Sequence, residues 1–207
     1  MFCGRRAASL CGLFIWVLVS LVLAGCATNR LIDSSVRSFT TATADLPLEP
    51  PFSFRFERLP SQQADAQTQD RLEEIALPVL AQKGLMPDAL SSHFTLELRV
   101  AVQAVNQANP FHVHWGFGAV GNDMWMHPMH MGLQPTLYRY SVHLLLRDAA
   151  LKTVVFESTA VHEGPWSDHT KVLPAVLLAA LQDFPQGSDT PRRVLIDLLP
   201  GGMQPRP

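Results

Sequence analysis

The sequence is poor in cysteine, and the few cysteines it has lie near one end. Its 207 residues contain three cysteines, which are Cys3, Cys11 and Cys26. A domain that follows residue 26 therefore has no thiol side chain. This excludes disulfide bonds, cysteine nucleophiles, redox chemistry and thiolate metal sites from such a domain.

An excess of positive charge is also lacking. The chain has 16 Lys+Arg against 18 Asp+Glu, a formal net charge of −2, and only 16% of its residues are charged. Without Arg5 and Arg6, which open an N-terminal apolar run, 14 basic residues remain against 18 acidic ones, a net charge of about −4. No basic stripe remains, so nucleic-acid binding has no electrostatic basis in this chain.

Recognisable catalytic motifs are missing as well. The sequence has no phosphate-binding glycine loop, dinucleotide fingerprint, kinase motif or zinc-protease motif. Glu57, Glu97 and Glu157 are expected on different strands without an evident partner, which does not support a two-carboxylate hydrolase. Ser167 and Asp168 precede a histidine, but a catalytic triad converges from separate elements. These two residues are more typical of a helix cap, and we expect a protein that is not an enzyme.

The N-terminal residues resemble a bacterial lipoprotein signal peptide. Two arginines precede the apolar residues 7–23, and Leu23-Ala24-Gly25-Cys26 has the form of a lipobox. Cys26 would carry the diacylglyceryl group and, after cleavage, an acylated amine. Two or three acyl chains make a stable membrane anchor. The alternative is an uncleaved transmembrane anchor, because about 17 apolar residues are just enough to span a bilayer.

The position after the lipobox predicts the destination. Ala27 stands where aspartate favours inner-membrane retention in similar lipoproteins. We therefore expect an outer-membrane lipoprotein that faces the periplasm and contacts the membrane through lipidated Cys26.

The periodicity of apolar residues predicts an α+β domain. Strict alternation indicates strands, beginning with an exposed strand at 36–43, whereas an i, i+3, i+4, i+7 spacing indicates helices. Pro174 is expected in the first turn of the second helix, which would begin at 170–173. The strands are expected at 36–43, 52–59, 94–102, 136–147 and 153–162, and the helices at 72–83 and 170–184.

These segments give the order β-β-α-β-β-β-α. We expect one domain with a mostly antiparallel sheet and two helices packed on one face. The predicted boundaries are a signal peptide at 1–25, a lipidated tether at 26–33, the periplasmic domain at 34–186 with a long loop at 106–135, and a C-terminal tail at 187–207.

The chain is similar to a family of uncharacterised lipoproteins, domain of unknown function 4136. The resemblance rests on the lipobox, the strand at 52–59, the helix that ends Ala81-Gln82-Lys83-Gly84-Leu85, and the closing segment 175–185. It covers roughly residues 33–186. It implies a periplasm-facing domain for which the family establishes no activity.

One segment carries residues suited to metal chemistry. Residues 111–131 hold four of the eight histidines and four of the seven methionines. Imidazole and thioether together are ligands that select Cu(I). Methionine and tryptophan are also common on adaptable protein-contact and membrane-contact surfaces, which is the alternative interpretation. The candidate ligands are His112, His114, Met124, Met126, His127, Met129, His130 and Met131.

Two functions remain open at this stage. The first is a non-enzymatic envelope adaptor or assembly factor that needs no cofactor and binds another envelope protein. The second is a periplasmic copper- or silver-binding lipoprotein that uses the His/Met segment. His143 and His162 are also expected on the polar faces of neighbouring strands, where they could pair across a hairpin.

Overall fold

The computed structural model describes residues 30–41, 49–105 and 136–206. These residues form one mixed sheet with strand order β3-β2-β4-β5-β6-β1-β7-β8. The strands are β1 (Arg30–Thr40), β2 (Phe52–Phe56), β3 (Leu85–Pro87), β4 (Phe94–Val105), β5 (Leu137–Asp148), β6 (Val154–Gly164), β7 (Ser188–Leu199) and β8 (Gly202–Pro205). The helices are α2 (Pro60–Ala64), α3 (Ala66–Gln82) and α4 (His169–Ala180). The prediction of a single-sheet α+β fold is confirmed.

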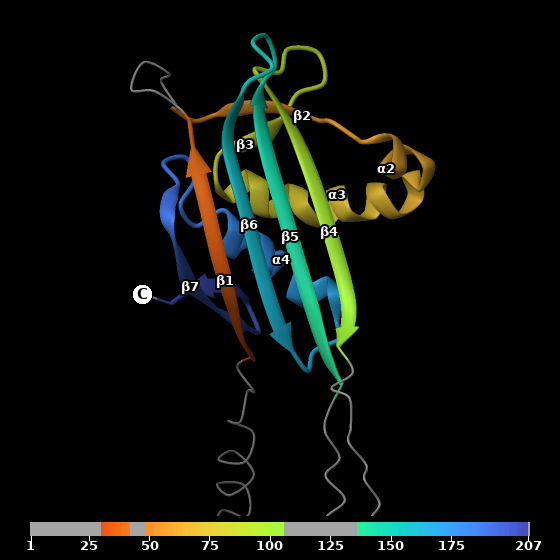
Figure 1. Ribbon diagram of the computed structural model, residues 1–207, viewed down its shortest axis with the longest axis vertical. Coiled ribbons are helices and arrows are strands. Elements are labelled where there is room, and N and C mark those ends of the chain that lie inside the picture. The colour runs from red at the N-terminus through yellow and green to blue at the C-terminus, as the bar shows by residue number, and fades with distance from the viewer. Residues whose placement is uncertain (1–29, 42–48, 106–135, 207) are drawn as a thin grey trace, which may run out of the picture.

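The centre of the sheet consists of long antiparallel strands. β4, β5, β6 and β1 run alternately up and down, and β7 and β8 continue this arrangement on one side (Figure 1). On the other side, β2 pairs in parallel with both β4 and β3. Among the described strands the sheet is therefore mostly antiparallel, with its parallel pairs confined to one end.

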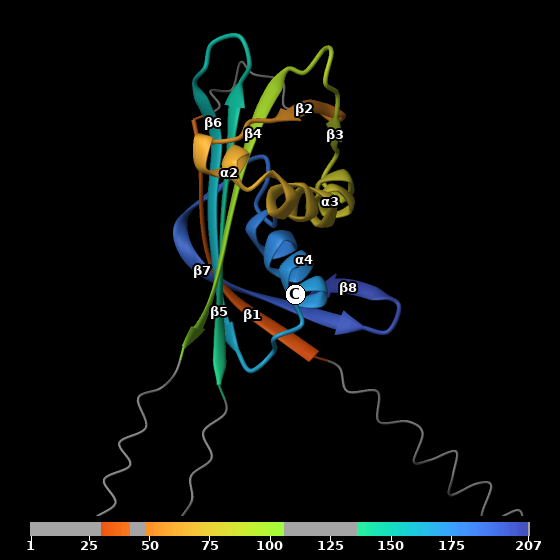
Figure 2. The ribbon, with the colours of Figure 1, turned by 90° about the vertical axis from the view of Figure 1, so that its right-hand side faces the viewer.

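Helices α3 and α4 lie on the same side of the sheet, as Figure 2 shows. α4 is almost entirely buried from Val172 to Ala180, so it forms the centre of the core. α3 is amphipathic and buries Ala76, Val79 and Leu80. The other side of the sheet carries no described helix, so its side chains are covered only by one another.

Alternation along each strand separates the two sides. In β4, Phe94, Leu96 and Leu98 join the core, whereas Arg99 and Ala101 are exposed on the helix-free side. Phe52 and Phe54 of β2 are likewise buried, and their rings contact Phe94 or neighbouring core aromatics edge-to-face. The period of two therefore separates the core-facing residues from those of the helix-free side, although Thr95 and Glu97 on that side are also buried.

Several predicted boundaries are wrong. β1 begins at Arg30, so residues 30–33 belong to the sheet and not to a tether. Residues 188–205 form β7 and β8 where a tail was expected, because Val194 and Ile196 are buried beside β1. α4 begins at His169, which places Pro174 in its second turn and not in its first.

Four elements were not predicted at all. α2, β3 and β8 are each five residues or shorter, and β7 begins with the polar sequence Ser-Asp-Thr-Pro-Arg-Arg. Pro78 lies inside α3. No helix in the described ranges is long and apolar enough to cross a membrane.

Candidate functional site

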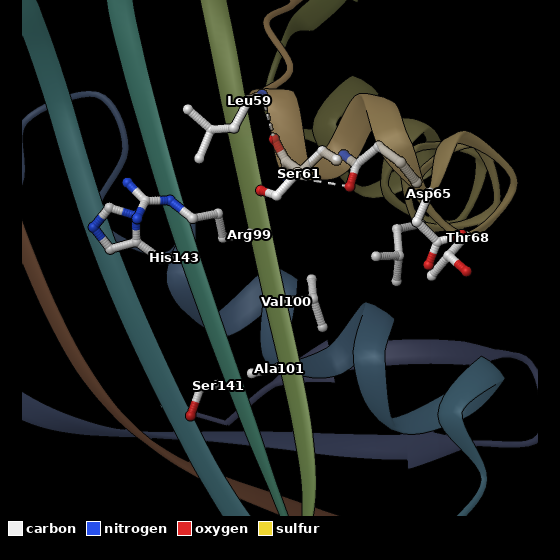
Figure 3. Close-up of a pocket in the computed structure, with 12 residues that line it drawn as sticks. Leu59, Ser61, Asp65, Thr68, Arg99, Val100, Ala101, Ser141 and His143 are labelled. Atoms are coloured by element: carbon white, nitrogen blue, oxygen red, sulfur yellow. Dashed lines mark hydrogen bonds between the residues drawn. The ribbon is translucent and has the colours of Figure 1, made fainter.

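The structure brings polar side chains together along β4, at the place where β2 ends. β2 pairs only with the first part of β4, from Phe94 to Leu96. The chain then turns away into α2, which lies beyond the edge of β4 (Figure 1). Between α2, α3 and β4 there is a groove of 440 Å³ (Figure 3).

The position of α2 is fixed by hydrogen bonds from Gln62. Its side-chain amide donates to the Leu98 carbonyl of β4 at 2.7 Å, and its side-chain oxygen accepts from the Leu59 N–H at 2.8 Å. Pro60 at the first turn suits a helix start because it has no N–H to satisfy. One side chain therefore closes the edge of β4 at Leu98 and orients the short helix.

An ionic cluster joins the chain before α2 to α3. Arg58 donates to both carboxylate oxygens of Glu73, at 2.7 and 2.6 Å, and to Asp70 at 2.7 Å. These hydrogen bonds to Glu73 and Asp70 raise the pKa of Arg58 above its usual value. Gln69 donates to Glu73 at 3.0 Å, so the carboxylate is well satisfied. This bidentate arrangement fixes the helix-side wall of the groove.

A second cluster lies on the helix-free side of the sheet. The Glu97 side chain is only 2% exposed and forms ion pairs with Arg99 at 2.7 Å and Arg147 at 3.0 Å. Arg147 also reaches Glu57 at 3.6 Å, and Glu57 accepts a hydrogen bond from Thr95 at 2.8 Å. Glu57 and Glu97 therefore have partners, and the expectation that they lack them is wrong.

The predicted pairing of His143 with His162 is also wrong. His143 lies opposite Arg99 on the helix-free side and contacts Glu157 at 3.1 Å. Figure 3 shows the His143 ring beside the Arg99 guanidinium. His162 is buried on the opposite side of the sheet, facing the core. β6 has apolar residues on both of its sides, so the alternation of its sequence did not show which side His162 would occupy.

His162 belongs to a buried polar layer near the start of α4. Its Nδ1 lies 2.7 Å from the Asp33 carbonyl, so this nitrogen carries the proton and donates. The Tyr140 hydroxyl donates to the Trp166 carbonyl at 3.0 Å and lies 2.9 Å from Nδ1 of His169. Burial raises the pKa of Tyr140. Tyr140 and His162 are buried, whereas His169 is exposed, and we assign these hydrogen bonds a structural role.

Asp168 stands at the N-cap position of α4, but its side chain does not cap the helix as the sequence predicted. Its side chain accepts from the Thr170 hydroxyl at 2.8 Å, and it makes no side-chain hydrogen bond to a helix N–H. Arg30 lies 4.0 Å from Asp168 and stacks over Trp166 at 4.6 Å. Hydrogen bonding to Thr170 and the nearby Lys171 and Arg30 charges lower the pKa of Asp168.

The remaining predicted site residues lie outside the described parts of the chain. These are Cys26 and the candidate metal ligands His112, His114, Met124, Met126, His127, Met129, His130 and Met131. The described part of the chain contains no group of three or more His, Cys, Asp or Glu side chains that could hold a metal ion.

No protein-family model and no curated protein sequence matches the chain. Several solved structures resemble the fold of this chain. A PelC variant dodecamer from Paraburkholderia phytofirmans matches with a TM-score of 0.44 and 13% identity, covering 74% of this chain and 98% of that one. A PelC dodecamer in another crystal form gives a TM-score of 0.41, 14% identity and coverages of 74% and 99%.

A PDZ domain protein from Parabacteroides distasonis has a TM-score of 0.46 and 12% identity. It covers 86% of this chain, which spans only 41% of that protein's length. None of these three likenesses reaches a TM-score of 0.5, so they carry no conclusion about function.

Sequence reasoning missed two features of the site. The first is the ionic cluster around Glu97, whose signal was the alternation of Thr95, Glu97 and Arg99 on one side of a strand. The second is the open edge of β4 after Leu98. No local signal could reveal that edge, because it depends on where a different strand stops.

Proposed function

We propose that the protein is a non-enzymatic lipoprotein of the cell envelope, anchored by Cys26 in the outer membrane and acting as a periplasm-facing adaptor. Within the described residues, no helix covers one side of the sheet, and this side is available to another envelope component.

The observation that carries the proposal is the short distance in sequence between Cys26 and the folded domain. β1 begins at Arg30, four residues after Cys26. Four residues span at most about 14 Å when fully extended. If Cys26 is lipidated, the Arg30 end of the sheet is therefore held close to the lipid headgroups.

The sheet register shows which residues share this end. Ser34 lies beside His162, His162 beside Tyr140, and Tyr140 beside Val102. The start of β1 and the end of β4 therefore lie at the same end of the sheet (Figure 1). In the proposed orientation, the end of β4 works near the membrane.

The ion pairs of the helix-free side support a binding role over a catalytic one. Glu97, Glu157 and Glu163 are each held by a basic side chain of the sheet, so their carboxylates are occupied. A carboxyl group that serves as a general acid or base must be able to reach a substrate proton. These pairs instead give a polar sheet surface on which each of the three carboxylates has a partner side chain.

Lipid labelling tests the anchor. We would express the full chain in a Gram-negative host with an alkyne analogue of palmitate, beside the variant Cys26→Ser. We expect label and outer-membrane fractionation for the unchanged chain, and neither for the variant. An unlabelled chain that retains Cys26, in a host that labels a control lipoprotein, would refute the proposal.

A copper-binding function is the second candidate, favoured by the density of histidine and methionine in residues 111–131. A Cu(I) competition titration would compare the chain with a variant in which Met124, Met126, Met129 and Met131 are leucine. Tight stoichiometric binding that the variant loses would support this function. Equal, weak binding by both proteins would refute the copper-binding function, and the adaptor would be the remaining proposal.

A further inference from the structure

The edges of the sheet are unequally protected. Its two outermost strands, β3 and β8, have three and four residues and each ends in proline. Short strands and proline are common means of preventing a sheet edge from pairing with another chain. β4 differs because β5 pairs along the whole of one edge, while on the other edge β2 pairs only with Phe94 to Leu96 and no described strand pairs with the rest.

The open segment begins directly after Leu98. The Leu96 carbonyl accepts from the Glu57 N–H at 2.9 Å, and the Leu98 carbonyl accepts from Gln62 at 2.7 Å. Backbone groups of alternate residues point to the same side of a strand. Those of Val100, Val102 and Ala104 therefore also point to this edge, where no hydrogen bond within the described residues reaches them.

The composition of the open segment favours pairing. Residues 100–105 read Val-Ala-Val-Gln-Ala-Val and contain no charged residue, glycine or proline. Val102 is 38% exposed, and Ala101, Gln103 and Ala104 are also exposed. An uncharged strand rich in β-branched residues with free N–H and C=O groups is a template for another strand.

We propose that this segment pairs with the same segment of a second copy, antiparallel about a two-fold axis through Val102. Val102 would then lie opposite Val102 of the second copy, and Val100 opposite Ala104. The Val100–Ala104 pair occurs twice, once on each side of the axis, so three pairs exchange two backbone hydrogen bonds each, about six in all. The two sheets become one continuous sheet across the dimer.

The segment is self-complementary in both length and charge. Its open part starts after Leu98, where Gln62 and α2 close the edge, and β4 ends at Val105. In the two-fold register Val105 of one copy lies opposite Arg99 of the other, so each strand ends where the other copy's α2 begins. No charged side chain lies directly opposite another, so like-charge repulsion does not oppose the pairing.

A second copy fits this edge better than a strand from an unrelated protein. The two-fold register satisfies the same backbone groups on both copies at once, as an isologous interface requires. A foreign strand would satisfy one copy and would need its own free edge of matching length. The pairing also does not depend on the lipid anchor, so it can be tested separately from the proposed function.

Cysteine crosslinking tests the register on the full chain in detergent, with Cys3→Ser, Cys11→Ser and Cys26→Ser so that no other thiol can form a disulfide. Residues opposite each other in a hydrogen-bonded antiparallel pair have Cα atoms about 5.5 Å apart, within the range of a disulfide. Val102→Cys should therefore form a disulfide dimer on oxidation. Ala104→Cys is the matched control, since in this register the two Ala104 positions lie about 13 Å apart.

A charge exchange gives the second measurement, by light scattering after size exclusion. Val102→Lys and Val102→Glu should each be monomeric, because like charges meet on the axis. Mixing the two variants should restore the dimer, and circular dichroism should show that both are folded. A monomeric unchanged chain, equal crosslinking at positions 102 and 104, or a dimer unaffected by Val102→Lys would each overturn the proposal.

Discussion

At the scale of single residues, Glu97 is the most constrained charged group of the described structure. Its carboxylate is nearly inaccessible to water and lies between the guanidinium groups of Arg99 and Arg147. A buried carboxylate is stable only when it is paired, and its removal leaves buried positive charge without compensation. The two arginines are partly exposed, which moderates this penalty.

We predict that Glu97→Gln lowers the free energy of unfolding by about 1–3 kcal/mol, measured by urea denaturation. The matched control is Glu163→Gln, which removes an ion pair with Arg139 between side chains that are both about half exposed. Its loss should be below about 0.5 kcal/mol, as for other surface pairs. Equal losses in the two variants would show that burial of Glu97 does not determine its contribution.

Residue-scale sequence reasoning succeeded where one side of a strand is apolar and the other is not. Phe52 and Phe54 were predicted to share a face, and both are buried. It failed for His162, because β6 has Phe156 on one side and Val155 on the other, both buried. The side that a histidine occupies was then decided by the register with β1 and β5, which no single strand encodes.

At the scale of elements, the start of α4 depends on an acidic residue. Asp168 accepts from Thr170 and lies near Lys171 and Arg30, which together lower its pKa in the folded state. A carboxyl group whose pKa is lower in the folded than in the unfolded state stabilises the fold above the unfolded pKa. That contribution is lost as the pH falls through the folded pKa.

The variant Asp168→Asn should therefore be less stable than the unchanged chain at neutral pH, and the difference should shrink as the pH falls below about 4. Chemical denaturation at a series of pH values between 7 and about 3 would measure it. Thr170→Val is the second variant. It removes the hydrogen bond from Thr170 to Asp168, and its stability should therefore depend less on pH than that of the unchanged chain. A stability difference that stays constant across this range would contradict the assignment.

The elements that were predicted are the long ones with a clear period. The strands that became β2, β4, β5 and β6, and both long helices, follow from alternation or helical spacing. β7 was missed because only its second half is apolar, and it is stabilised by pairing with β1 far away in sequence. α2 was missed because none of its residues is buried, and it is fixed by the Gln62 hydrogen bond to Leu98.

At the scale of the whole molecule, the proposed anchor and the proposed dimer constrain each other. A two-fold axis through Val102 reverses the direction of the strands in the second copy. The two Arg30 residues, and with them the two short connections to Cys26, then lie on opposite sides of the axis. Both can reach one membrane only if the strands run along its surface.

This arrangement predicts that the β5–β6 turn lies close to the lipid in the dimer. In a monomer the turn is free to stand away from the membrane, by as much as about 36 Å along β5. Ala150 in this turn is exposed, and after lipidation of Cys26 the variant Ala150→Cys would carry the only free thiol of the described domain. A donor dye at this position should transfer energy efficiently to an acceptor dye in the bilayer.

Adding Val102→Lys to the labelled chain should reduce this transfer, because the monomer is held at one end only. Ser167→Cys provides the control label, since Ser167 is exposed near the Arg30 end of the sheet and should stay close to the membrane in both forms. Equal transfer from position 150 with and without Val102→Lys would refute the strand orientation. Reduced transfer from position 150 with unchanged transfer from position 167 requires both the anchor at Cys26 and the pairing at Val102, because neither alone holds both ends of the sheet at the membrane.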